Sequence, residues 1–166
     1  MKQIVLLSDT HYSLDERFFE YFEKADEIWH AGDIGDLSVT DKLKEYSSLK
    51  AVWGNIDNST VRTEFNEILC FQCEKVSVMM THIGGSPGKY NKTILPIIKE
   101  KNPDLFICGH SHILKVMFDK KYNLLYMNPG AIGNYGAHKV KTILCFKINK
   151  KNIEDLQVIE IPRNRT

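Results

Sequence analysis

Seven side chains that can bind metal ions are spread along this chain, and each follows a short apolar run of β-strand character. They are Asp9, His11, Asp33, Asn55, His82, His110 and His112. A mixture of imidazole, carboxylate and amide groups is typical of Mn, Fe, Zn, Co or Ni sites, whereas Ca and Mg prefer oxygen ligands throughout. A carboxylate shared by two cations would screen their repulsion and fix their spacing. The set therefore predicts a centre for two divalent metal ions.

The apolar runs explain how distant residues could meet. They cover residues 3–8, 28–32, 50–54, 76–81 and 104–109. Ligands of a sheet flanked by helices bind beyond the carboxyl ends of the strands, so these runs should deliver their polar side chains to one crevice. Two pairs, Asp9 with His11 and His110 with His112, are two residues apart, and such residues in extended backbone point to the same side.

Glycine precedes three of the seven sites. Gly32, Gly54 and Gly109 each stand directly before a candidate ligand. A missing Cβ at a sharp turn allows close packing, which a crowded site requires. We therefore expect these glycines to lie against the ligands.

Taken in order, these motifs resemble the calcineurin-like metallophosphoesterase family, and more closely its short branch, which includes small phosphodiesterases and the retromer subunit Vps29. The similarity runs through Asp9-Thr10-His11, Gly32-Asp33, Gly54-Asn55-Ile56-Asp57, Thr81-His82, Gly109-His110-Ser111-His112 and Asn128-Pro129-Gly130. It covers nearly the whole chain. The fold that it implies is an α/β fold, a four-layer α/β/β/α sandwich of two mixed β-sheets flanked by helices.

The resemblance also assigns the ligands. It implies that the first metal is bound by Asp9, His11, Asp33 and His112. It implies that the second is bound by Asp33, Asn55, His82 and His110, with Asp33 as the bridge. Two divalent ions are therefore expected as cofactors, Mn first, with Ni, Zn, Fe, Co or Mg as alternatives. The implied reaction is hydrolysis of small phosphodiesters by in-line attack of a hydroxide shared by the metals.

The chain departs from larger members of the family beside the asparagine. Many of them have a histidine there that can protonate the leaving oxygen, whereas this chain has Ile56, which cannot transfer a proton. Asp57, one place further on, has a counterpart in the short branch. We count Asp57 with Asp33, Asn55 and His82 as candidate catalytic residues. Asp57 could act as an acid, orient Asn55 or His82, or cap the following turn.

Other reactive side chains have plainer interpretations. His30 lies inside an apolar run without a partner at metal spacing, so we expect a buried, hydrogen-bonded histidine. His138, in a glycine-rich stretch, is a further possible proton donor. Cys70 and Cys73 have redox-motif spacing but lie in an alternating apolar segment with no second pair, which favours ordinary reduced thiols.

Composition limits the class of protein. The 166 residues, 43% hydrophobic and 26% charged, fit one domain over residues 1–166 without a cap domain. A formal net charge of +1 provides no long-range attraction to anionic membranes or long nucleic acids, so a small phosphoester is the expected partner. No run is long enough for a signal peptide or a membrane span, which predicts a cytoplasmic protein. A homo-oligomer is expected because exposed strand edges could pair.

Periodicity and helix-end signals predict individual elements. One helix should begin at Ser13, which forms a capping-box pattern with Glu16, and others should cover residues 38–46 and 94–101. Pro96 suits the first turn of a helix, and Asn102-Pro103 would end it. Strands are expected over 124–127, 140–148 and 156–161, with a turn at 149–152. Residues 84–88 read as a loop that borders the substrate or as a long turn.

These observations predict a dinuclear metal-dependent phosphodiesterase. The alternative from another class is a Vps29-like scaffold that binds metal without catalysis, and a phosphomonoesterase or nuclease is a further possibility. The complete ligand series favours the enzyme, because a scaffold has no physical need for costly polar groups that converge on one crevice.

Overall fold

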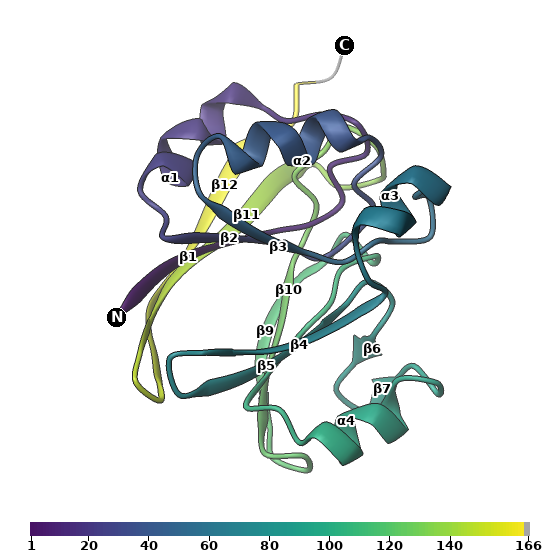
Figure 1. Cartoon of the computed structure of the whole chain (residues 1–166), viewed down its shortest axis with the longest axis vertical. Coiled ribbons are helices and arrows are strands. Elements are labelled where there is room, and N and C mark those ends of the chain that lie inside the picture. Colours follow the sequence, from purple (N-terminus) through teal and green to yellow (C-terminus); the bar gives the residue numbers. More distant parts are fainter. Residues whose placement is uncertain (165–166) are drawn as a thin grey trace.

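Two β-sheets pack face to face, with helices on their outer sides, in the computed structural model, which describes residues 1–164 (Figure 1). The first sheet has the order β12-β11-β1-β2-β3. Its strands are β1 (Lys2–Leu7), β2 (Glu27–His30), β3 (Ser48–Ala51), β11 (Val140–Asn149) and β12 (Asn152–Pro162). β1, β2 and β3 run parallel, whereas β11 pairs antiparallel with both β1 and β12. The sheet is therefore mixed.

The second sheet is also mixed and has the order β4-β5-β8-β10-β9. Its strands are β4 (Ile68–Cys73), β5 (Val76–Thr81), β8 (Leu105–Ile107), β9 (Leu114–Asp119) and β10 (Leu124–Pro129). The three central strands are parallel and the two edge strands are antiparallel. A small hairpin of β6 (Gly85–Ser86) and β7 (Lys89–Tyr90) follows β5. The segment 84–88 is thus largely a hairpin.

Three buried apolar clusters fill the three spaces between the four layers. The run of β1 is apolar on both faces because successive side chains point to opposite sides. Ile4 and Leu6 belong to the cluster between the sheets, whereas Val5 and Leu7 belong to the cluster under the helices of the first sheet. A third cluster joins the second sheet to α4, where Ile98 packs. This arrangement confirms the predicted α/β/β/α sandwich.

The helices are short and lie on the outside. They are α1 (Phe19–Glu23), α2 (Leu37–Lys44), α3 (Ser59–Glu64) and α4 (Leu95–Lys101). The expected second and third helices are confirmed to within two residues. Pro96 lies in the first turn of α4, and Asn102 ends it in the left-handed conformation (φ +45°). α3, β4 and β9 were not among the predicted elements.

The predicted start of the first helix at Ser13 is wrong. A 3₁₀ turn over Glu16–Phe18 precedes α1, and its N-cap is Asp15, whose side chain accepts a hydrogen bond from the Arg17 amide. Ser13 instead donates its amide to the Thr10 carbonyl, in a turn that leaves the candidate site. The Asp15 carboxylate also accepts from Lys141 at 2.9 Å, a distant contact that periodicity cannot reveal.

The strands expected in the second half are present. β12 begins four residues earlier than predicted, at Asn152, and the turn before it falls at residues 150–151. The four cysteines carry free thiols, of which only Cys70 is exposed, as the sequence interpretation expected. Within residues 1–164, no helix is both long enough and apolar enough to cross a membrane.

Candidate metal centre

Loops from both sheets bring the candidate ligands together. Asp9, Asp33 and Asn55 follow β1, β2 and β3 of the first sheet. His82 follows β5 of the second sheet, and the loop after β8 carries both His110 and His112. The parallel strands of the two sheets therefore end at one common crevice. Six of the seven side chains form two compact groups there.

The first group consists of Asp9, His11 and His112, whose ligand atoms lie within 4.8 Å of one another. Asp9 Oδ1 is 3.2 Å from His112 Nε2 and 3.7 Å from His11 Nε2. The other oxygen of Asp9 accepts hydrogen bonds from Ser8 Oγ at 2.6 Å and from the His110 amide at 3.2 Å. One oxygen thus fixes the carboxylate, while the other is directed at the two imidazoles.

The second group consists of Asp33, His82 and His110. Asp33 Oδ2 is 3.1 Å from His82 Nε2. His82 Nδ1 lies 2.8 Å from the Ala31 carbonyl, so this nitrogen donates and leaves the Nε2 lone pair directed at the site. Asn55 Oδ1 lies 2.9 Å from His110 Nδ1, which brings the seventh predicted residue to the same group.

Asp33 lies between the two groups. Its Oδ2 is 3.3 Å from His11 Nε2 in the first group and 3.1 Å from His82 Nε2 in the second. Its Oδ1 accepts the Ile56 amide at 3.1 Å, which holds the carboxylate in place. This geometry fits the bridging role that the resemblance implies for Asp33.

The donor set fits divalent metal ions. Zinc lies about 2.0–2.2 Å from nitrogen and oxygen ligands, so ligand atoms of one ion are about 3.0–3.5 Å apart. Several distances above fall in this range. Asp9 Oδ1, His11 Nε2 and His82 Nε2 are buried, and none of them makes a hydrogen bond within residues 1–164. Such orphaned atoms are costly unless a cation or proton satisfies them.

Carboxylates and imidazoles of the two groups shift one another's pKa values because they lie so close together. Burial would raise the pKa of Asp9 and Asp33, but the neighbouring histidines hold both values well below the usual range. Burial opposes the charged form of His11, yet the carboxylates of Asp33 and Asp9 raise its pKa to about 9. The pKa of His82 is raised by the same carboxylates against burial. Without metal, protons on histidine therefore balance the carboxylates, and a metal must displace them.

Backbone conformation at the site differs from the extended form assumed from the sequence. Asp9, His11, Asp33, His110 and His112 all have positive φ, between 43° and 70°. This left-handed region is uncommon for residues other than glycine, and clusters of such residues mark functional sites. His110 and His112 contribute to different groups, whereas Asp9 and His11 contribute to the same group. Both pairs reach the site as predicted, but their backbone forms left-handed turns there and is not extended.

The glycines before the ligands are required by close packing, as predicted. A Cβ on Gly54 would lie 2.1 Å from Asp33 Oδ1. A Cβ on Gly109 would lie 2.1 Å from Ser8 Oγ and 2.9 Å from Asp9 Oδ2. Any side chain at either position would therefore displace a candidate ligand.

The Asp57 carboxylate links two of the loops that carry candidate ligands. Its carboxylate is buried and accepts three backbone amides: Ile34 at 3.1 Å, Gly35 at 2.7 Å and Gly54 at 2.7 Å. The loops that carry Asp33 and Asn55 are thereby joined. Of the roles that the sequence left open, this geometry favours orientation of the ligands over proton transfer, because both oxygens already face backbone donors.

Two further residues contact the first group. The ring of Tyr135 stacks on His11, with centroids 4.9 Å apart, and His138 meets His112 edge-on at 5.3 Å. His138 Nε2 is 2.8 Å from the Gly133 carbonyl, and burial lowers its pKa. Tyr135 was absent from the sequence prediction, because an exposed tyrosine in a glycine-rich loop carries no periodic signal.

His30 supports the site without joining it. The side chain is fully buried, and its ring nitrogens lie 3.0 Å from Thr10 Oγ1 and 3.1 Å from the Gly32 amide. Burial lowers the pKa of His30 to about 4, so the ring is neutral and accepts from the Gly32 amide. This is the hydrogen-bonded histidine that the sequence predicted.

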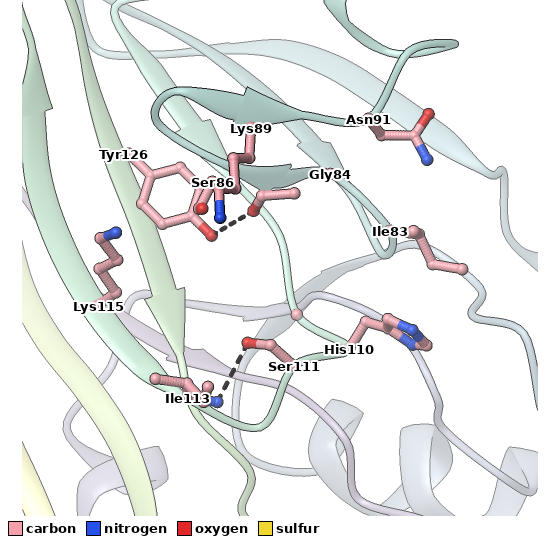
Figure 2. A pocket seen from close by; sticks show the side chains of 12 residues that line it. Ile83, Gly84, Ser86, Lys89, Asn91, His110, Ser111, Ile113, Lys115 and Tyr126 are labelled. Atoms are coloured by element: carbon pink, nitrogen blue, oxygen red, sulfur yellow. Dashed lines mark hydrogen bonds between the residues drawn. The ribbon is translucent and has the colours of Figure 1, made fainter.

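A pocket of about 450 Å³ opens beside the second group. The loop of Gly109, His110 and Ser111 forms one side of it (Figure 2). The β6–β7 hairpin and the beginning of β9 form the other sides. The pocket and the second group therefore share His110.

Comparison with known proteins agrees with this geometry. Residues 1–151 match the family model of the calcineurin-like phosphoesterase superfamily domain. A probable metallophosphoesterase of Methanocaldococcus jannaschii is 32% identical over 133 residues, which cover 77% of this chain and 67% of that protein. A probable metallophosphoesterase of Methanothermobacter thermautotrophicus is 25% identical over 134 residues, 77% of this chain and 76% of that protein.

Solved structures share the fold at lower sequence identity. Vps29 from Entamoeba histolytica in complex with zinc has a TM-score of 0.76 and 15% identity, and the match covers 98% of this chain and 99% of that one. A predicted phosphoesterase from Streptococcus pneumoniae has a TM-score of 0.71 and 21% identity, with coverage of 98% and 90%. These similarities show the architecture, and they include both a predicted enzyme and Vps29.

Proposed function

Because this chain belongs to the calcineurin-like phosphoesterase superfamily, we propose that it is a dinuclear metal-dependent phosphodiesterase that hydrolyses small phosphodiesters. One observation carries the proposal. Three orphaned buried atoms, on Asp9, His11 and His82, converge with the Asp33 carboxylate between them. A protein gains nothing in stability from such an arrangement unless cations occupy it.

Each residue then has a role of its own. Asp9, His11 and His112 would hold one cation, and His82, His110 and Asn55 would hold the other, with Asp33 shared. Two bound cations supply charge for the phosphate oxygens and lower the pKa of a water molecule at the site. We propose manganese as the first candidate, with Ni, Zn, Fe, Co and Mg as alternatives.

The charges in direct contact with Asp9 and Asp33 support a diester over a monoester as the group that is hydrolysed. A monoester dianion needs more positive charge than a diester monoanion. Arg62 is committed elsewhere: its guanidinium lies 4.1 Å from the Trp53 ring and donates to the carbonyls of Asp57 and Asn55. Among residues 1–164, no lysine or arginine forms an ion pair with Asp9 or Asp33. The cations themselves would therefore carry most of the positive charge.

A non-catalytic metal-binding scaffold is the second candidate. The structural similarity to Vps29 in complex with zinc favours it, because that protein shares the fold and has a metal-bound form. Metal binding alone cannot separate the two candidates, whereas turnover can.

The deciding experiment measures hydrolysis of bis-p-nitrophenyl phosphate and p-nitrophenyl phosphate by metal-stripped protein titrated with Mn, Ni, Zn and Mg. Asp33→Asn is the control, since it preserves shape but weakens the shared ligand. We expect metal-dependent turnover of the diester, with slower turnover of the monoester, and loss of both in the control. Two bound metal equivalents without turnover of either ester would favour the scaffold.

A further inference from the structure

The pocket beside His110 has a fixed floor and apolar rims. Tyr126 is 2% exposed, and its hydroxyl donates to the Gly85 carbonyl at 2.7 Å, which joins the floor to the β6–β7 hairpin. The Asn91 amide donates to the Gly84 carbonyl at 3.0 Å and closes the base of the same hairpin. Ile83 and Ile113, which are 38% and 66% exposed, border the opening. The pocket is therefore preorganised and offers apolar contact to a bound group.

Two lysines line the same pocket. Lys89 belongs to β7 and Lys115 to β9, and Figure 2 shows both on the Tyr126 side, across the opening from His110. The lysine ion pairs within residues 1–164 include neither Lys89 nor Lys115. An anion in the pocket would be attracted by both ammonium groups.

The positions of these groups indicate which chemical groups a fitting substrate would carry. His110 lies on one side of the pocket, and the scissile phosphodiester would lie beside it. The two lysines lie across the opening from His110. The apolar rims suit a ring or hydrocarbon between them. A phosphate monoester carries about −1.5 to −2 charge at neutral pH, which matches two ammonium groups.

We propose that the substrate is a phosphodiester whose substituent carries a terminal phosphate, and that this phosphate binds Lys89 and Lys115 in the pocket beside His110. The inference rests on the proposed function for the identity of the scissile bond. It goes further by naming the substrate class: molecules of nucleotide size with an apolar ring and a second phosphate.

The first test is binding and does not depend on metal or hydrolysis. Adenosine monophosphate is titrated calorimetrically into metal-free protein, beside adenosine and inorganic phosphate. Lys89→Met and Lys115→Met are combined in one variant, because methionine keeps the apolar stem and removes the charge. Lys120→Met, at an exposed lysine outside the pocket, is the matched control. We expect the double variant to bind adenosine monophosphate at least about tenfold more weakly than the wild type or the control.

The second test uses the metal-loaded enzyme. The ratio of kcat/KM for a 5′-phosphorylated dinucleotide to that for the same dinucleotide without the phosphate is compared in the three proteins. We expect a ratio of about ten or more in the wild type and the control, and a ratio near one in the double variant.

The outcomes separate the two proposals. Equal hydrolysis of both dinucleotides by the wild type, or unchanged binding in the double variant, would overturn the pocket assignment and leave the phosphodiesterase intact. An equal loss of binding in the Lys120→Met control would also overturn it, since only general charge would then matter. Lysine-dependent binding without hydrolysis of any diester would support the pocket and remove the proposed function.

Discussion

The Oδ2 atom of Asp33 lies 3.3 Å from Nε2 of His11 and 3.1 Å from Nε2 of His82. These histidines belong to different ligand groups, so a single atom contacts both. The Ile56 amide holds the other oxygen of Asp33, and Gly54 leaves the space in which the carboxylate lies. The candidate centre therefore depends more on Asp33 than on any ligand that serves one group.

A comparison of two substitutions tests this dependence. Asp33→Ala should abolish binding of both metal equivalents. His11→Ala should weaken metal binding only at the group of Asp9, His11 and His112, because His11 serves that group alone. Elemental analysis of folded, metal-loaded protein measures the stoichiometry, with circular dichroism as the check on folding. Equal metal content in the two variants would contradict the bridging assignment.

Metal affinity should rise with pH up to about 9. The pKa of His11 is raised to about 9 in the metal-free protein, so below that pH a proton occupies the site that the metal needs. Each displaced proton makes the apparent affinity about tenfold stronger per pH unit. Competition with a chelator at pH 6.5, 7.5 and 8.5 measures the slope. An affinity that levels off above pH 7 would show that His11 titrates as an ordinary histidine.

The loops that carry the candidate ligands are joined to one another by hydrogen bonds. Asp57 connects the loop after β2 to the loop after β3 through the Ile34, Gly35 and Gly54 amides. His30 on β2 supports the loop after β1 through Thr10. The short helices contribute packing, and these buried polar contacts set the loop geometry.

The Asp57 contacts make a prediction about stability. Asp57→Asn should lower the free energy of unfolding by about 2 kcal/mol, because it removes a charged acceptor and turns an amide donor toward backbone donors. Urea denaturation of the metal-free protein measures the change. Asp36→Asn is the control, since Asp36 is an exposed N-cap that asparagine replaces well, and it should change stability by less than about 0.5 kcal/mol. Unchanged stability of the Asp57→Asn variant together with a large loss of turnover would contradict the positioning role and indicate that Asp57 acts as a proton donor.

The sequence predicted elements well where their periodicity was strong. The apolar run of β1 gave the correct type and nearly correct bounds because its side chains are buried. The helix α4 was located by its end signals, Pro96 in the first turn and Asn102 at the C-cap. The start of the first helix was misplaced, since its cap depends on Asp15 and the distant Lys141. α3 has only six residues, too few for a periodic signal.

The same limit applies to the candidate site. Residue types at strand ends were enough to bring all seven predicted ligands together. The left-handed backbone at Asp9 and Asp33 was not foreseen, because local sequence permits many turns and tertiary contacts select one. The pairing of Asp57 with backbone amides and the stacking of Tyr135 on His11 likewise depend on distant segments.

Each ligand group draws its residues from both sheets. Asp9 and His11 come from the first sheet and His112 from the second, while Asp33 comes from the first and His82 from the second. The cluster between the sheets, which includes Leu6, holds them in register beneath the crevice. The edge strands β9 and β12 are partly exposed and could pair with a second copy of the chain. The homo-oligomer expected from the sequence stays a prediction. The sandwich is thus the frame that sets the distance between two metal positions.

The most direct test is anomalous diffraction from a crystal loaded with manganese or zinc, recorded above and below the absorption edge of the metal. We predict two anomalous peaks, one surrounded by Asp9, His11 and His112 and the other by His82, His110 and Asn55, with the Asp33 carboxylate between them. A single peak, or peaks away from Asp33, in a crystal with excess metal would contradict the dinuclear centre.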